Sequence, residues 1–333
     1  MKKFSFLLSL LCIYLVSLSV YSQQDPKDEE ILRIDTSLVF VPVKVTDRNN
    51  KNITDLKKEN FRLFEDGIEQ EIASFESVDA PFTIALLLDV SDSTKFKTKE
   101  IQDAAIAFVE NLRPEDRVLI FAFNQNLVKI ADVRNSDVEN LSILIRLSEN
   151  VGRTSLYQTV ETVANDYLKS ISGKKAIVLF TDGIDTASYK QTFASSLKTI
   201  DELDAIIYPI QYETVEDARK AYDNSILGKS VVLVTSKGEL LTNAYKRGTL
   251  YLRILANKTG GKYFLADSLE NLSNSFSKIV KELREQYGLS FYPKNQDLTT
   301  RKRKIKVELN IPKAVTHTRK TYIPKTVTEP GNN

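Results

Sequence analysis

The chain has 333 residues, of which 46 are basic and 44 acidic, so its formal net charge is only +2. A balance this close provides no global field for nucleic acid or for an anionic membrane surface. Hydrophobic residues make up 42% of the chain, which excludes a disordered protein and indicates a globular one with a sizeable core.

The N-terminal segment has the pattern of a secretory signal peptide. Lys2 and Lys3 precede an uncharged apolar run, and Val20 and Ser22 supply the small residues of a cleavage site. The competing interpretation is an uncleaved anchor, because the run approaches the roughly 20 residues that span a bilayer. The only cysteine, Cys12, lies here, so the mature chain cannot form a disulfide. We expect export to the periplasm or the extracellular space, with no membrane span after cleavage.

The region that follows the signal peptide is expected to be all-β. Residues 23–35 are polar and charged and predict a loose leader. Period-two alternation then predicts two strands around a turn in residues 37–56. Residues 60–76 predict another pair of strands around the turn residues Asp66 and Gly67.

After residue 81, continuous apolar runs alternate with amphipathic segments. Residues 82–90 form the first such run, as expected for a parallel strand that is covered on both faces. The segments between the runs carry apolar residues at helical spacing. This alternation predicts an α/β fold with a doubly wound, mainly parallel sheet flanked by helices. Further strands are predicted at 117–123, 175–183, 205–211 and 262–266, and helices at 99–112, 137–147, 156–168, 193–200, 250–259 and 269–287.

Two segments interrupt the alternation. Residues 213–249 exceed the usual connection length, and residues 229–242 within this insertion predict a small hairpin. The C-terminal region returns to strand alternation, in which Lys304 and Lys306 face water rather than nucleic acid. Because neither β region has enough strands to be stable alone, the two are predicted to form one discontinuous β-sandwich. The predicted order is a signal peptide (1–22), a leader (23–35), the N-terminal sandwich segment (36–78), the α/β domain (82–286), the C-terminal sandwich segment (287–324) and a tail (325–333).

Small oxygen-bearing side chains follow the ends of two predicted strands. Asp89 ends the first apolar run and is followed by Ser91 and Ser93, Asp182 ends a later run, and Thr154 lies in a loop before a helix. Ligands of α/β sheets bind at the carboxyl ends of strands, so we expect these side chains at one edge. Oxygen donors without His or Cys suit a hard cation such as Mg²⁺. The pattern therefore predicts a metal site.

Other interpretations of these residues remain open. Each carboxylate alone is consistent with a helix cap. Asp89 and Glu100 also occupy positions 1 and 12 of an EF-hand loop, although Thr94 replaces its glycine and a strand precedes it. Asp185 is either a ligand of a second, outer ion or a solvated loop residue. His317 is the only histidine and is expected on an exposed strand, so no acid–base pair and no catalytic site are predicted.

Three motifs in order resemble the von Willebrand factor type A domain: D-x-S-x-S, G-x-T and T-D-G. The flanks V-x-V-x-D, F-x-L-x-E-D-G-x-x-Q-x-I-x-x-F and Y-G-L-S-F-Y-P are similar to those of exported bacterial proteins related to this domain. The resemblance covers residues 82 to about 286 and implies a Rossmann-like fold with a metal-ion-dependent adhesion site. It implies that Mg²⁺, or Mn²⁺ or Ca²⁺ in its place, is held by Asp89, Ser91, Ser93, Thr154 and Asp182.

Two residues depart from the family pattern. Asp92 stands where many relatives have glycine, and Arg153 stands where a second glycine is common. We expect Asp92 to project outward and add negative potential beside the ion. Arg153 either holds an acidic group of the partner or occupies the open face itself.

The function that the sequence favours is an exported, non-enzymatic protein-binding and adhesion module. The resemblance implies that the ion coordinates an exposed Asp or Glu of a partner protein. One alternative is a structural or assembly component of an envelope complex, in which the metal only stiffens the loops. Another is a metal-dependent hydrolase, for which the sequence offers no evident base.

Overall fold

The computed structural model describes residues 38–134, 138–147, 151–223, 232–266, 269–295, 297 and 301–324. The predicted signal peptide, leader and tail lie outside these residues. Within the described ranges, no helix is long and apolar enough to cross a membrane. All of the described residues belong to one compact unit, Thr36–Asn333.

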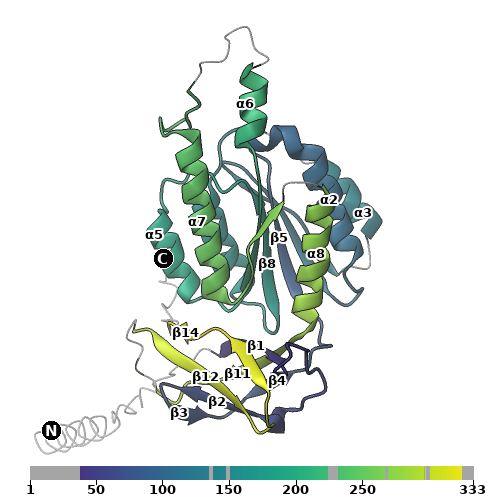
Figure 1. Ribbon diagram of the computed structural model, residues 1–333, viewed down its shortest axis with the longest axis vertical. Coiled ribbons are helices and arrows are strands. Elements are labelled where there is room, and N and C mark those ends of the chain that lie inside the picture. The colour runs from purple at the N-terminus through teal and green to yellow at the C-terminus, as the bar shows by residue number, and fades with distance from the viewer. Residues whose placement is uncertain are drawn as a thin grey trace, which may run out of the picture. The chain divides into compact units, whose positions relative to one another are not determined.

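The centre of the α/β region is a six-stranded sheet (Figure 1). Its strands are β5 (Thr83–Asp89), β6 (Arg117–Phe123), β7 (Leu127–Arg134), β8 (Lys175–Thr181), β9 (Ile206–Tyr212) and β10 (Phe264–Ala266). They lie in the order β10-β9-β8-β5-β6-β7, and all neighbours are parallel except the antiparallel pair β6 and β7. Every residue of β5, β8 and β9 is buried, because helices cover both faces. The predicted doubly wound sheet is confirmed.

Helices form a layer on each face of this sheet. They are α2 (Thr98–Glu110), α3 (Val138–Arg146), α4 (Leu156–Thr162), α5 (Phe193–Asp201), α6 (Val215–Asp223), α7 (Leu241–Thr259) and α8 (Leu269–Arg284). Leu86 of β5 packs in a core with residues of α2, α3 and α8, whereas the adjacent Leu87 packs in a second core with residues of α4, α5 and α7. In Figure 1, α2, α3 and α8 accordingly lie on the other side of the sheet from α5 and α7.

Several local elements differ from the sequence predictions. The edge strand β7 and the helix α6 were not predicted, and the helix expected at 156–168 continues beyond α4 as a π-helical turn, Val163–Leu168. The small hairpin expected at 229–242 is present in minimal form in its described residues, 232–242, where Val234 and Leu240 form one isolated antiparallel bridge. The second strand expected in residues 37–56 is likewise reduced to one bridge, between Thr46 and Asn52.

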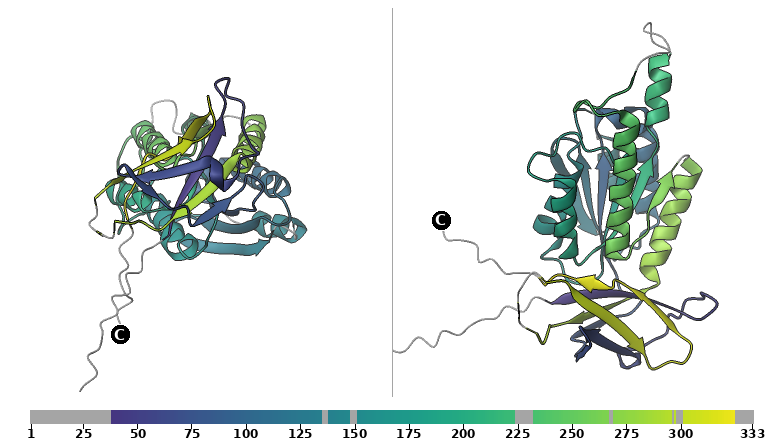
Figure 2. Two further views of the ribbon diagram at one scale, coloured as in Figure 1. Left: turned by 90° about the horizontal axis from the view of Figure 1, so that it is seen from below. Right: turned by 60° about the vertical axis from the view of Figure 1, so that its left-hand side comes forward.

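The N- and C-terminal flanks form two antiparallel sheets that share one core. The strands are β1 (Val39–Thr46), β2 (Phe61–Glu65), β3 (Ile68–Gln70), β4 (Ser74–Glu76), β11 (Gln286–Phe291), β12 (Arg303–Leu309), β13 (Val315–Thr318) and β14 (Thr321–Tyr322). Their orders are β13-β1-β11-β4 and β14-β12-β2-β3, so each sheet combines strands from the two ends of the chain. Figure 2 shows this as yellow strands beside purple ones.

The core of these sheets confirms the discontinuous β-sandwich. Val41, Leu63, Tyr287 and Ile305 are buried together in it, and they come from both flanks. In β12, Ile305 is buried while Lys304 and Lys306 are exposed, as predicted. A short 3₁₀ helix, Lys58–Asn60, leads into β2.

Lys174 ties the sandwich to the α/β domain where the chain passes between them. Its Nζ donates hydrogen bonds to the carbonyl oxygens of Ser77 (3.2 Å), Val78 (3.0 Å) and Gln286 (3.1 Å). Burial lowers the pKa of Lys174 to about 8, since the ammonium group has lost most of its water. The three carbonyl groups take the place of that water.

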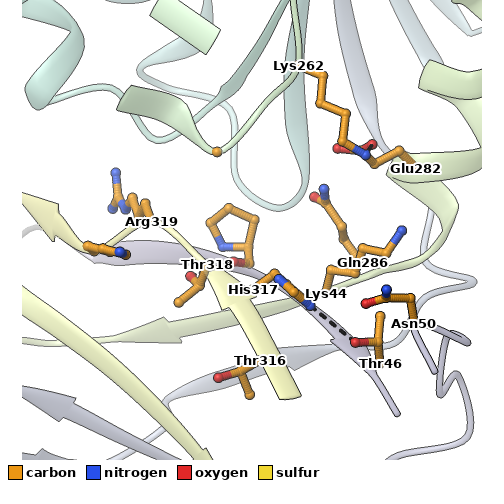
Figure 3. Close-up of a pocket in the computed structure, with 13 residues that line it drawn as sticks. Lys44, Thr46, Asn50, Lys262, Glu282, Gln286, Thr316, His317, Thr318 and Arg319 are labelled. Carbon is orange, nitrogen blue, oxygen red and sulfur yellow. Dashed lines mark hydrogen bonds and ion pairs between the residues drawn. The ribbon is translucent and has the colours of Figure 1, made fainter. Parts of the chain in front are cut away.

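A polar cavity of about 510 Å³ lies beside this joint, between β1, β13 and α8 (Figure 3). His317 is exposed on β13, as predicted, and its Nε2 lies 3.1 Å from Thr46 Oγ1. Three cationic side chains that line the cavity have carboxylate partners, which leaves its charge nearly balanced. The pairs are Lys44 with Glu285, Lys262 with Glu282, and Arg319 with Asp204.

Candidate metal centre

Asp89 ends β5 with a carboxylate that is fully buried. Its Oδ1 accepts hydrogen bonds from Ser91 N (3.1 Å) and Ser91 Oγ (2.6 Å), and its Oδ2 accepts one from Thr181 Oγ1 (2.7 Å). Thr181 is the last residue of β8, the strand next to β5. The carboxylate is therefore held between the ends of two neighbouring parallel strands.

The loop after β5 turns its hydroxyl groups toward this carboxylate. Ser91 Oγ lies 3.0 Å from Ser93 Oγ. Thr94 Oγ1 donates to the carbonyl oxygens of Asp89 (3.0 Å) and Ser91 (2.8 Å), which closes the loop. The chain then enters a 3₁₀ helix, Asp92–Lys97, directly from a strand. The EF-hand interpretation is wrong, because an EF-hand loop runs from one helix to another.

Asp182 follows β8 and is also fully buried. Its Oδ1 accepts from Ile184 N (2.9 Å), its Oδ2 accepts from Thr214 Oγ1 (3.1 Å), and the Ser93 hydroxyl donates to the same carboxylate. Thr214 was not identified from the sequence. Its position two residues after the end of β9 was the available signal, since that strand ends at the same edge of the sheet.

Thr154 is buried in a loop that is hydrogen-bonded to both of the others. Its backbone N donates to Thr186 Oγ1 (3.0 Å), and its carbonyl oxygen accepts from Thr186 N (2.9 Å). On the other side, Gly152 O accepts from Asp92 N (2.9 Å). The structure thus brings the three loops that carry the five predicted residues to one edge of the sheet.

The two carboxylates are not neutralised by a cation within the described part of the chain. Neither Asp89 nor Asp182 has an ion pair with any residue that the structure describes. Burial, followed by repulsion from Asp182, raises the pKa of Asp89 to about 7. Burial also raises the pKa of Asp182. A cation among these oxygens would remove both penalties.

The donor set fits a hard divalent cation. Across the described ranges of the chain, no group of three or more His, Cys, Asp or Glu side chains is suited to a metal. A site at this edge must therefore combine two carboxylates with hydroxyl groups. Oxygen ligands of this kind are those that Mg²⁺, Mn²⁺ and Ca²⁺ accept.

Three further residues near the donor set, Asp92, Arg153 and Asp185, have different environments. Asp92 is exposed, as expected. Arg153 is exposed as well, and its side chain has no hydrogen bond or ion pair with another described residue. Asp185 is not a solvated residue, because it is 2% exposed and accepts hydrogen bonds from Tyr157 N at the start of α4 and from Ser188 N. The solvated interpretation was wrong, because a cap supplied from another loop is invisible in the sequence, and the role of Asp185 as a ligand of an outer ion stays a prediction.

A close approach of two glycines sets the position of the Asp182 loop. Gly183 has a φ of +86°, which favours glycine. A Cβ on Gly248 in α7 would lie only 2.3 Å from Gly183 O. The absence of both side chains lets α7 pack directly against the residue that follows Asp182.

Comparison with known proteins was made for sequence and for structure. No curated protein sequence matches the chain. Similar solved structures include a von Willebrand factor type A protein from Catenulispora acidiphila (9% identity, 79% of this chain and 73% of that chain, TM-score 0.48). Another is proximal thread matrix protein 1 from the mussel byssus with a zinc-occupied MIDAS motif (13%, 64% and 47%, 0.45). A third is the vWF domain of the type V pili tip protein Mfa5 from Porphyromonas gingivalis (13%, 61% and 95%, 0.43).

Identities and scores this low carry no argument about function. The family model does identify the α/β region, because it matches residues 84–184 and its description is von Willebrand factor type A domain. That range begins in β5, includes Asp89 and Thr154, and ends just after Asp182. The chain therefore contains a von Willebrand factor type A domain.

Proposed function

We propose that this protein is an exported, non-enzymatic binding module that captures an acidic side chain of a partner protein through a divalent cation. The proposal is supported by two buried carboxylates that have no ion pair with any described residue and that lie among hydroxyl groups at one sheet edge. Asp89, Ser91, Ser93, Thr154 and Asp182 would hold the ion, preferably Mg²⁺. The ion supplies a Lewis-acidic position for a carboxylate oxygen of the partner.

The residues around the donor set support capture of an anion from outside. A cavity of about 620 Å³ opens beside Ser93 and Thr154. The exposed Arg153 lines it and is available to donate to the second oxygen of an incoming carboxylate. Asp92 lines the same cavity, so it repels an acidic group that approaches over its loop. The two residues together restrict the direction from which a partner can bind.

Thermal unfolding of the purified chain tests the ion. Mg²⁺ or Mn²⁺ added after EDTA treatment should raise the melting temperature, because a ligand of the native state adds about 2.7 kcal/mol at 100 times its Kd. Asp89→Ala and Asp182→Ala should abolish this rise, and Thr154→Ala should weaken it. Asp92→Asn is the matched control, since it removes a charge from the same loop and should keep the full response. A wild-type melting temperature that does not change in millimolar metal would refute the proposed metal site.

Capture from an envelope or extracellular extract tests the partner. Wild type in Mg²⁺, wild type in EDTA and Asp89→Ala in Mg²⁺ are compared on the same extract. A protein retained only in the first sample supports metal-dependent binding. Equal retention in all three samples would place the binding surface away from the donor set.

A further inference from the structure

The cavity beside the donor set has a mixed lining. It is lined by Ser93, Arg153 and Thr154 and also by aliphatic side chains. The aliphatic lining residues are Ile184, Ala218, Val232, Leu233, Val234 and Leu241. Most of them belong to the segment that separates β9 from α7, which was predicted as an insertion with a small hairpin.

Two of these aliphatic residues are unusually exposed. Val232 is 66% exposed and Val234 is 54% exposed, although both line a concave surface. The backbone around them is fixed: Thr235 N donates to Glu239 O (2.8 Å), and Leu241 N donates to Leu233 O (2.9 Å). Several aliphatic side chains that line one cavity together with a few polar groups are typical of a binding site.

The same cavity also has basic lining residues, which suit it to negative charge. Lys95 and Arg153 line it beside the hydroxyl groups of the donor set, and Asp92 is its only acidic lining residue among those that the structure describes. Apolar and anion-binding surfaces are therefore continuous within one cavity. Its volume of about 620 Å³ lies in the range of sites that enclose a whole ligand.

We propose that this cavity selects the residue next to the captured carboxylate, so that the preferred partner is a peptide segment with a large apolar residue within two positions of an Asp or Glu. The inference rests on the proposed function, because the acidic residue is the one that the ion would hold. The apolar neighbour packs against Val232, Val234 and Leu241. Arg153 lines the cavity near the acidic residue of the partner, and its positive charge favours a segment without nearby basic residues.

Short synthetic peptides test this inference. The chain contains no tryptophan, so the fluorescence of a tryptophan in the peptide reports on the peptide alone. The probe is a capped Gly-Ser peptide with one Asp followed by Trp, and its control has Asn in place of Asp. In Mg²⁺, the emission of the Asp-Trp peptide should shift to the blue as protein is added, and that of the Asn-Trp peptide should not. An Asp-Leu peptide should displace the probe at a concentration at least tenfold lower than an Asp-Ser peptide.

A pair of valine variants assigns the effect to the cavity. Val234→Ser should weaken the binding of the Asp-Trp peptide at least fivefold and leave the Mg²⁺ response of the melting temperature unchanged. Val128→Ser is the matched control, because Val128 is 58% exposed on β7 and does not line the cavity. Equal displacement by Asp-Leu and Asp-Ser, an unaffected Val234→Ser variant, or no blue shift at all would overturn the inference. Binding that survives EDTA and Asp89→Ala would instead overturn the proposed function.

Discussion

Replacing Asp89 by asparagine should stabilise the metal-free protein and abolish its response to metal. Asn has almost the same shape as Asp but carries no charge. In EDTA, the variant no longer buries an ionised carboxylate beside Asp182, so its free energy of unfolding should rise. In Mg²⁺, the same variant has lost a charged ligand and should gain nothing from the ion. The substitution thus has opposite effects in the two conditions.

The size of the effect follows from the pKa of Asp89, which rises from 3.8 to about 7 in the folded protein. A shift of about 3 pKa units corresponds to about 4 kcal/mol of destabilisation by the charged form. The Asn amide presents one acceptor fewer to Ser91 and Thr181, and losing a hydrogen bond costs about 1 kcal/mol or more. We therefore expect a net gain of about 2 kcal/mol at pH 8, which is roughly 4 °C in Tm.

The sign of this effect depends on pH. Because the pKa is raised on folding, the folded protein binds the proton more tightly than the unfolded chain does. The contribution of Asp89 to stability in EDTA is therefore fully present below about pH 4 and is lost as the pH rises to about 7, its folded pKa. Asp89→Asn removes this contribution, so the variant and the wild type should differ little at pH 5 and clearly at pH 8.

Thermal melts at pH 5 and pH 8, each in EDTA and in Mg²⁺, give the measurement. Asp185→Asn is the control. Like Asp89→Asn, it neutralises a buried carboxylate, but this one lies on the loop after β8. Asp185 caps α4 and contacts Lys237, so this variant should be destabilised in both buffers and should keep the metal response. An Asp89→Asn protein that is less stable than wild type at pH 8 in EDTA would refute the reasoning.

Two further substitutions and one deletion test the surrounding structure. Lys174→Met should lower the free energy of unfolding in urea by about 2 kcal/mol, because three buried carbonyl groups lose their donor; an unchanged midpoint would contradict this role. Gly248→Ala should cost about 1–3 kcal/mol through overpacking against Gly183, and it should also weaken the Mg²⁺ response by displacing the loop that carries Asp182. Deleting residues 287–333 should expose the N-terminal strands to limited proteolysis, and full protection there would show that they are stable alone.

Much of the fold could be predicted because its central strands are covered on both faces. β5 and β8 read as continuous apolar runs, which is the pattern of short strands buried on both sides. The edge strand β7 was missed because it pairs only with β6 and leaves Val128 and Val133 exposed. Its sequence therefore lacks the uniform burial that identified the other strands. The helix α6 was missed for a related reason, since its mixed polar sequence has no continuous apolar stripe.

The candidate site was predictable to the extent that its residues follow strands. Asp89 and Asp182 stand directly at strand ends, and topology alone brings such positions together. Asp185 was misjudged because it caps α4 through Tyr157 N, 28 residues earlier in the chain, which is a tertiary contact. The apolar lining of the cavity was also missed, because the hairpin predicted over Val232 and Val234 does not indicate which side chains line a cavity. Contacts between loops leave no local pattern in the sequence.

The sandwich lies at the opposite end of the central sheet from the candidate metal centre. Lys174 precedes β8, and its partners Ser77 and Val78 precede β5, so the joint lies at the amino ends of these strands. The donor set lies at their carboxyl ends. Each strand has seven residues, and at about 3.3 Å per residue the two sites are roughly 20 Å apart. The N- and C-terminal flanks therefore complete a sandwich without covering the donor set. Figure 1 shows the sandwich strands and α6 beyond opposite ends of the central strands, so the sandwich lies at the end away from the donor set.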